Sequence, residues 1–175
     1  MATLSSAARS RDTALQLAAT VLAYSTCDIE SVASGTVLPE RLEEALHDLV
    51  HEFCYHARKS IERHSLTGVA KTIIVHREPT VAEVASSPDA VVELTSESFW
   101  WVVNRIMHSL DFSVIKQVQA ISTRTGGLTI SRLDVGGPRL VAFSSDYDKG
   151  TQLHYVSLEA LVLCFVRQIV PKFET

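Results

Sequence analysis

Hydrophobic positions recur every three to four residues through the first part of the chain, which is the spacing of amphipathic helices. The clearest stretch is 39–64, where Pro39 suits the first helical position and the apolar residues share one helical face. Those apolar residues are Leu42, Leu46, Leu49, Val50, Phe53, Ala57 and Ile61. Less regular patterns predict a helix over 11–34, with a break at the polar residues 25–28, and another helix over 97–110.

After residue 110 the period of the hydrophobic pattern changes from about 3.6 to about 2, which is typical of strands. The strand-like runs are 118–124, 128–133, 140–145 and 153–156. Gly126-Gly127 and the segment Gly136-Gly137-Pro138 separate these runs, and we interpret both as hairpin turns. Earlier in the chain, residues 71–76 predict one further short strand and residues 81–87 a helical turn.

The chain closes with residues 157–170, which are apolar on nearly every side and are followed by Pro171. This pattern predicts a helix that is buried all round. The order of elements therefore predicts an α+β fold, mainly a helical bundle, with a small antiparallel β meander before a buried C-terminal helix. We expect residues 1–175 to form one domain, with 11–110 as its helical part and 118–156 as its meander.

Composition narrows the class of protein. Apolar residues make up 46% and charged residues 21% of the chain, as in ordinary globular proteins. The net charge of −4 argues against a general polyanion binder, so any contact with RNA needs a local patch. The three widely spaced cysteines predict reduced thiols and a cytoplasmic protein. The longest apolar run, residues 160–166, is far short of the roughly 20 residues that cross a membrane, so we expect no membrane contact.

Histidines gather on the predicted helix 39–64. His47 and His51 are four residues apart and share a helical face, which Cys54 and Arg58 extend. Because zinc accepts imidazole and thiolate ligands together, one interpretation is a metal-binding protein that uses His47, His51 and Cys54. Histidine and cysteine are also common at the boundary of an apolar face, and no second pair of ligands follows. We therefore predict no bound metal and no cofactor.

A second group of polar residues lies on the predicted helix 97–110. Its inward stripe is formed by Phe99, Val103, Ile106 and Leu110. The opposite side carries Trp101, Asn104, Arg105 and His108. Because an indole in water is unfavourable, we expect this side to meet another subunit, the small sheet or a ligand. In the intramolecular alternative, Trp101 packs under the meander and Asn104 caps a loop.

The segment NRIMHS, residues 104–109, resembles the signature of the HEPN superfamily (higher eukaryotes and prokaryotes nucleotide-binding domains). In that family a helix-borne Arg is commonly followed by Asn and, a few residues later, by His. Asn104 and His108 match the Asn and the His. Val103 stands where the family has its Arg, and Arg105 lies one residue past Asn104. The resemblance covers the helical part of the chain, because the predicted sheet is not part of the minimal family bundle.

The resemblance implies a metal-independent ribonuclease of bacterial defence or toxin–antitoxin type. His108 would then act as general acid or base, since the pKa of imidazole is about 6.5. Asn104 and Arg105 would hold the scissile phosphate of RNA, with Arg58 as the alternative holder. Since Val103 replaces the family's Arg, a degenerate member without catalytic activity is equally compatible with the sequence.

HEPN proteins commonly form dimers that bring two motif helices together. We expect a homodimer here on physical grounds as well, because an outward Trp101 and an all-apolar last helix leave more apolar surface than one small domain covers. The rival function is therefore a non-enzymatic dimeric interaction or binding module, with Trp101 in the subunit interface.

Overall fold

The structure is a computed structural model that describes residues 6–27, 35–78, 95–124, 127–145 and 153–174. The helices in chain order are α1 (Ser6–Ser25), α3 (Leu38–Arg63), α4 (Thr67–Ala70), α6 (Phe99–Met107) and α7 (Leu158–Cys164). The strands are β1 (Ile74–Glu78), β2 (Thr95–Ser98), β3 (Ser109–Arg124), β4 (Gly127–Ser145) and β5 (Leu153–Ser157). More of these residues lie in helices than in strands, so the predicted α+β, mainly helical fold class is confirmed.

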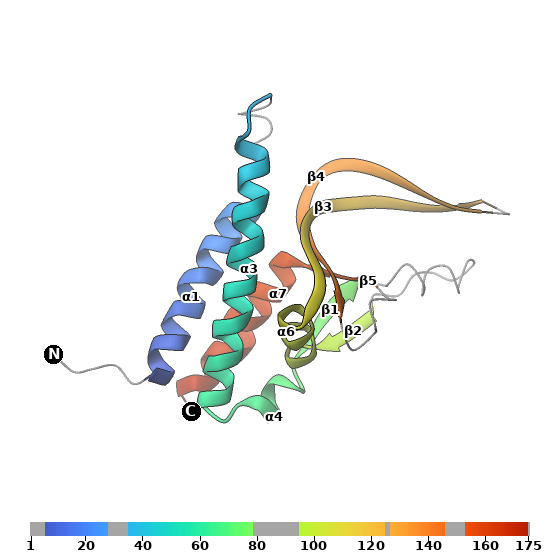
Figure 1. Ribbon diagram of the computed structural model, residues 1–175. Helices are drawn as coiled ribbons and strands as arrows, with labels where there is room; N and C mark the ends of the chain where they lie inside the picture. The colour runs from blue at the N-terminus through green and yellow to red at the C-terminus, as the bar shows by residue number, and fades with distance from the viewer. Residues whose placement is uncertain (1–5, 28–34, 79–94, 125–126, 146–152, 175) are drawn as a thin grey trace.

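The five strands form one antiparallel sheet in the order β2-β1-β5-β4-β3. The consecutive strands β3, β4 and β5 are the predicted meander, although β3 already begins at Ser109 and not at residue 118. Strand β1 overlaps the short strand that we predicted over 71–76, and it pairs with β5. Strand β2 also lies within 11–110, at a place where we predicted no strand. In Figure 1, α1, α3 and α7 lie side by side, and the strands lie to one side of these helices.

The segment Gly136-Gly137-Pro138 is not the hairpin turn that we predicted, because it lies inside β4. The pairing of β3 with β4 shifts at this point, since Lys116 pairs with Arg139 but Val118 pairs with Asp134. Strand β4 therefore carries extra residues against β3 there. Glycine and proline are tolerated in strands at such bulges, so these residues mark an irregularity within one long strand. The other predicted turn, Gly126-Gly127, lies partly outside the described residues, since Gly126 is not described, and on either side of it Arg124 pairs with Gly127.

Two helices follow the local pattern closely. Helix α3 matches the predicted range 39–64 within one residue at each end, and Pro39 lies in its first turn. Helix α1 ends at Ser25, where the polar break was predicted. Residues 28–34 and 81–87, on which two further predictions fall, lie outside the described residues.

The C-terminal segment differs from the predicted helix 157–170. Helix α7 passes into a π-helix over Phe165–Ile169 and then into a 3-10 helix over Val170–Glu174. The widening has a local cause: Val170 donates to the carbonyl of Phe165, and Pro171 has no N–H to donate. The segment is not buried all round either, because Glu159, Arg167 and Gln168 are exposed.

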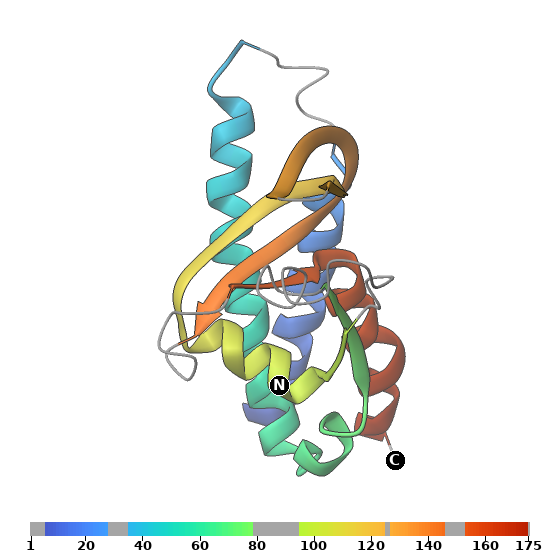
Figure 2. The same ribbon diagram turned by 90° about the vertical axis from the view of Figure 1, so that its right-hand side faces the viewer.

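Aromatic rings join three of these elements in the core. The ring of Phe165 lies 5.5 Å from that of Phe53 on α3 and 6.0 Å from that of Phe99 on α6, measured between centroids. All three side chains are fully buried. In Figure 2, α6 crosses in front of α3, and the C-terminal helix, in red, lies to the right of both. None of the helices in the described ranges is both long and apolar enough to span a membrane.

We expect Phe165→Ala to lower the free energy of unfolding by about 3–5 kcal/mol, because it removes a buried ring that contacts two other elements. Urea unfolding followed by circular dichroism measures this loss. The matched control is Val37→Ala, at a side chain that is 65% exposed, with an expected change within about 0.5 kcal/mol. A loss below about 1 kcal/mol for Phe165→Ala would contradict this account of the core.

Candidate functional site

The short helix α6 is fixed at its start by a cap and along its length by an apolar face. The hydroxyl of Ser98 accepts a hydrogen bond of 3.2 Å from the backbone N–H of Trp101. Ser98 is also the last residue of β2, so α6 follows this strand directly. The buried positions follow helical spacing and are Phe99, Val102, Val103 and Ile106. His108 follows as the C-terminal cap residue, directly before β3, so the end of α6 brings it to α3.

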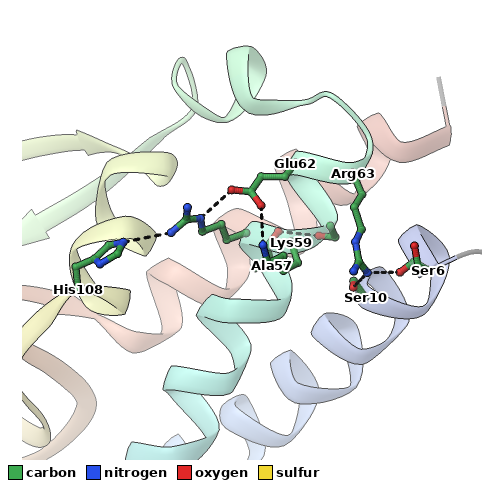
Figure 3. Close-up of polar contacts among 9 residues, drawn as sticks. Ser6, Ser10, Ala57, Lys59, Glu62, Arg63 and His108 are labelled. Carbon is green, nitrogen blue, oxygen red and sulfur yellow. Dashed lines mark hydrogen bonds and ion pairs between the residues drawn. The ribbon is translucent and has the colours of Figure 1, made fainter.

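At this point the side chain of His108 contacts an arginine of helix α3. The Nε2 atom of His108 lies 3.4 Å from Nη1 of Arg58 on α3, across 50 residues of sequence. A guanidinium only donates hydrogen bonds, so this contact requires Nε2 as the acceptor and favours the tautomer with its proton on Nδ1. His108 is exposed and Arg58 is half-buried, so the pair lies at the protein surface. Figure 3 shows His108 reaching from α6 toward α3.

Glu62 holds the other side of this arginine. Its Oε1 accepts a hydrogen bond of 2.9 Å from Nε of Arg58, and its Oε2 accepts one of 3.3 Å from Nζ of Lys59. Partial burial raises the pKa of Glu62, but the hydrogen bonds and positive charges of Arg58 and Lys59 outweigh burial and hold it below its ordinary value of 4.5. Glu62 is therefore an anion at neutral pH.

Trp100 completes the surroundings of Arg58. The Cζ atom of Arg58 lies 5.7 Å from the centre of the Trp100 ring, which is within the range of a cation–π contact. Among the described residues, Arg58 makes no further hydrogen bond beyond those to Glu62 and His108. We call the group formed by Arg58, Lys59, Glu62, Trp100 and His108 the α3–α6 junction. It combines a planar cation, a second cation and an imidazole, which are groups suited to binding one phosphate and moving a proton.

The predicted site residues do not converge on one point. The Nδ2 atom of Asn104 donates a hydrogen bond of 2.8 Å to the backbone carbonyl of Trp100, so this amide bonds its own helix and does not cap a loop. The guanidinium of Arg105 lies 4.9 Å from the centre of the Trp101 ring, on the stripe of α6 next to the one that carries His108. Of the predicted catalytic residues, only His108 takes part in the α3–α6 junction.

Trp101 does not point outward as we expected. Its ring lies 5.3 Å from the ring of His154 on β5 and 6.4 Å from that of Phe143 on β4. The side chain is half-buried. The structure thus favours the intramolecular alternative, in which Trp101 packs against the sheet. We gave two physical reasons for a dimer. The first, an outward Trp101, no longer holds. The second, an all-apolar last helix, is weakened because one face of the C-terminal segment is exposed.

The histidines and the cysteine of α3 point in different directions. Cys54 is fully buried in the core, and burial raises its pKa. The ring of His47 packs with its edge on Phe112, 4.4 Å between centroids, whereas His51 is exposed. Among the described residues, no group of three or more His, Cys, Asp or Glu side chains is arranged to hold a metal ion.

Sequence reasoning missed Glu62 and Trp100 as parts of this site. One local signal was available, since Glu62 lies four residues after Arg58 and such pairs are neighbours on a helix. No local signal joins Arg58 to His108, because their contact depends on how α6 packs against α3.

The chain was compared with protein-family models, with curated protein sequences and with solved structures, and none of the three comparisons finds a match.

We expect the ion pairs of Glu62 to make the stability of the fold depend on pH. Because folding lowers the pKa of Glu62, these pairs stabilise the fold above about pH 4.5, and this stabilisation is lost as the pH falls further. Glu62→Gln should therefore cost about 1 kcal/mol at pH 7 and clearly less at pH 3, as measured by urea unfolding.

The matched control is Glu44→Gln, which removes an ion pair with Arg41 on the same helix. Both of those side chains are largely exposed, so the expected loss at pH 7 is below about 0.5 kcal/mol. An equal loss at pH 7 and pH 3 for Glu62→Gln would show that the charge of Glu62 is not what stabilises this site.

Proposed function

We propose that the chain is a HEPN-like protein of bacterial defence or toxin–antitoxin type, cytoplasmic, which cleaves RNA at the α3–α6 junction without a metal. The observation that carries this proposal is the contact of 3.4 Å between Arg58 and His108. It pairs the histidine of the NRIMHS segment with an arginine, which is the combination that the family resemblance requires. Arg58 takes the place of the arginine that Val103 replaces.

The chemistry of this pair suits cleavage of a phosphodiester. A phosphate oxygen of RNA binds the guanidinium of Arg58, which neutralises the negative charge that develops on phosphorus-bound oxygens. When the phosphate takes up the N–H groups of Arg58, the lone pair of Nε2 of His108 is released and accepts the proton of the adjacent 2′-hydroxyl, whose oxygen attacks phosphorus. The bond to the 5′-oxygen breaks, that oxygen takes a proton from water, and protonated His108 gives its proton to the hydroxide that remains. The products are a 2′,3′-cyclic phosphate and a 5′-hydroxyl, and no electrons are exchanged.

The charge balance of the site supports one local phosphate contact. Arg58 and Lys59 contribute two positive charges against one negative charge on Glu62. The whole chain carries a net charge of −4, so binding of long polyanions along the surface is disfavoured. A degenerate member of the family would keep phosphate binding at Arg58 and lose cleavage.

We expect His108→Ala and Arg58→Ala each to reduce RNA cleavage by at least about 100-fold, because they remove the proton acceptor and the phosphate ligand. Arg105→Ala should reduce cleavage less, since Arg105 lies on Trp101 and not beside His108. Gel analysis of transfer RNA and total RNA after incubation measures the rates. EDTA should leave them unchanged.

The matched control is His51→Ala, which removes an exposed imidazole from the same helix as Arg58 and should leave cleavage intact. Wild-type protein that leaves both RNA samples intact over several hours would exclude the ribonuclease. If phosphate still perturbs the NMR signals of Arg58 in that case, the degenerate form of the proposal stands.

A second candidate function, a non-enzymatic dimeric interaction module, is favoured by a separate observation. Large apolar side chains are exposed near the end of α1 and at the start of α3: Tyr24 by 39%, Val37 by 65% and Leu38 by 50%. This candidate function requires these side chains to form one apolar patch, because contiguous apolar patches mark contact with another protein chain. The partner in this candidate function is a second copy of the chain.

For this module we expect a dimer mass in light scattering at tens of micromolar protein. Substituting Val37→Glu together with Leu38→Glu should give a monomer with an unchanged circular dichroism spectrum, because charges cannot be buried in an apolar interface. Ile74→Glu, at a residue 45% exposed on β1, is the control and should leave the dimer intact. A monomer mass for the wild-type protein would exclude this function.

A further inference from the structure

Arg58 is held in one orientation by groups on three sides. Glu62 accepts from its Nε, the Trp100 ring lies against the guanidinium, and His108 accepts from its Nη1. Because the guanidinium is a rigid plane, fixing Nε and the plane also fixes the direction of each N–H bond at the far end. The contact with His108 therefore depends on the contact with Glu62.

Glu62 itself is fixed from its own helix. Arg58 precedes it by four residues and Lys59 by three, so both cations reach the carboxylate from the preceding turn of α3. Each oxygen of the carboxylate accepts from one cation: Oε1 accepts from Arg58 and Oε2 accepts from Lys59. An amide at this position offers one oxygen and no charge, and it cannot accept from both cations equally.

From this geometry we infer that Glu62 is a positioning residue, which orients Arg58 so that Nη1 meets Nε2 of His108 and the guanidinium edge next to His108 receives the phosphate. Glu62 touches neither the substrate nor the reacting atoms. The use of this arrangement for RNA cleavage rests on the proposed function, whereas the effect of Glu62 on the state of His108 does not.

The ring nitrogens of His108 test the inference directly. Nitrogen NMR of the neutral ring distinguishes the Nδ1–H form from the Nε2–H form. In the wild-type protein we expect mainly the Nδ1–H form, because Nε2 accepts from Arg58. Glu62→Gln should shift the ring toward a mixture of both forms, and Arg58→Lys should do the same because it removes Nη1. Glu62→Asp, which keeps the charge on a shorter side chain, should restore part of the wild-type signal.

The matched control is Glu44→Gln, which removes a carboxylate bonded to Arg41 on the same helix and should leave the His108 signal unchanged. An unchanged Nδ1–H signal in Glu62→Gln would overturn the inference, whether or not the protein cleaves RNA.

Kinetics separate this inference from the proposed function. If the wild-type protein cleaves RNA, Glu62→Gln should lower kcat by about 10- to 100-fold with little change in KM, since a misplacement of about 1 Å can cost on the order of 100-fold. If the His108 signal shifts in Glu62→Gln but the wild-type protein cleaves no RNA, the proposed ribonuclease is wrong and Glu62 is still the residue that positions Arg58. If both the His108 signal and kcat are unchanged in Glu62→Gln, Glu62 does not position Arg58, and the proposed ribonuclease is not contradicted.

Discussion

The contact of Phe165 with Phe53 and Phe99 decides where helix α6 lies, and the candidate site depends on it. A helix of nine residues is too short to be stable in water without packing against its neighbours. Phe99 begins α6, so its fixed ring anchors that end of the helix against α3 and the C-terminal segment. The other end of α6 then presents His108 to α3, which is how residues 50 positions apart in sequence come together.

Packing brings the residues of the α3–α6 junction together, and their charges determine what the junction is suited to bind. One carboxylate, Glu62, is shared by Arg58 and Lys59, so the α3–α6 junction carries a small positive excess on a chain whose net charge is −4. Such a balance suits recognition of a single phosphate by oriented hydrogen bonds. It does not suit attraction of a long polyanion by charge density. Any selectivity of this site must therefore come from geometry, and Glu62 contributes to it by directing Arg58.

The features that sequence reasoning predicted are local. Helix α3 follows from apolar residues at helical spacing, and the break of α1 follows from polar residues near Ser25. The errors arise where distant segments decide the outcome. Gly136-Gly137-Pro138 is compatible with a turn or with a bulge, and the pairing partner β3 selects the bulge. The pattern around Trp101 shows that its ring must be covered, but only the sheet reveals that Phe143 and His154 cover it.

The geometry of α6 also explains why the NRIMHS segment predicted His108 as a site residue but did not predict the arginine that contacts it. Residues 100, 104 and 108 are spaced by four and follow one line along the helix, and this line faces α3, as the contacts of Trp100 and His108 with Arg58 show. Residues 101 and 105 lie on the next line, where Trp101 meets the sheet and Arg105 lies on Trp101. Arg105 is thus separated from His108 by the surface of its own helix. An arginine beside His108 has to come from α3, and only the packed fold brings Arg58 there.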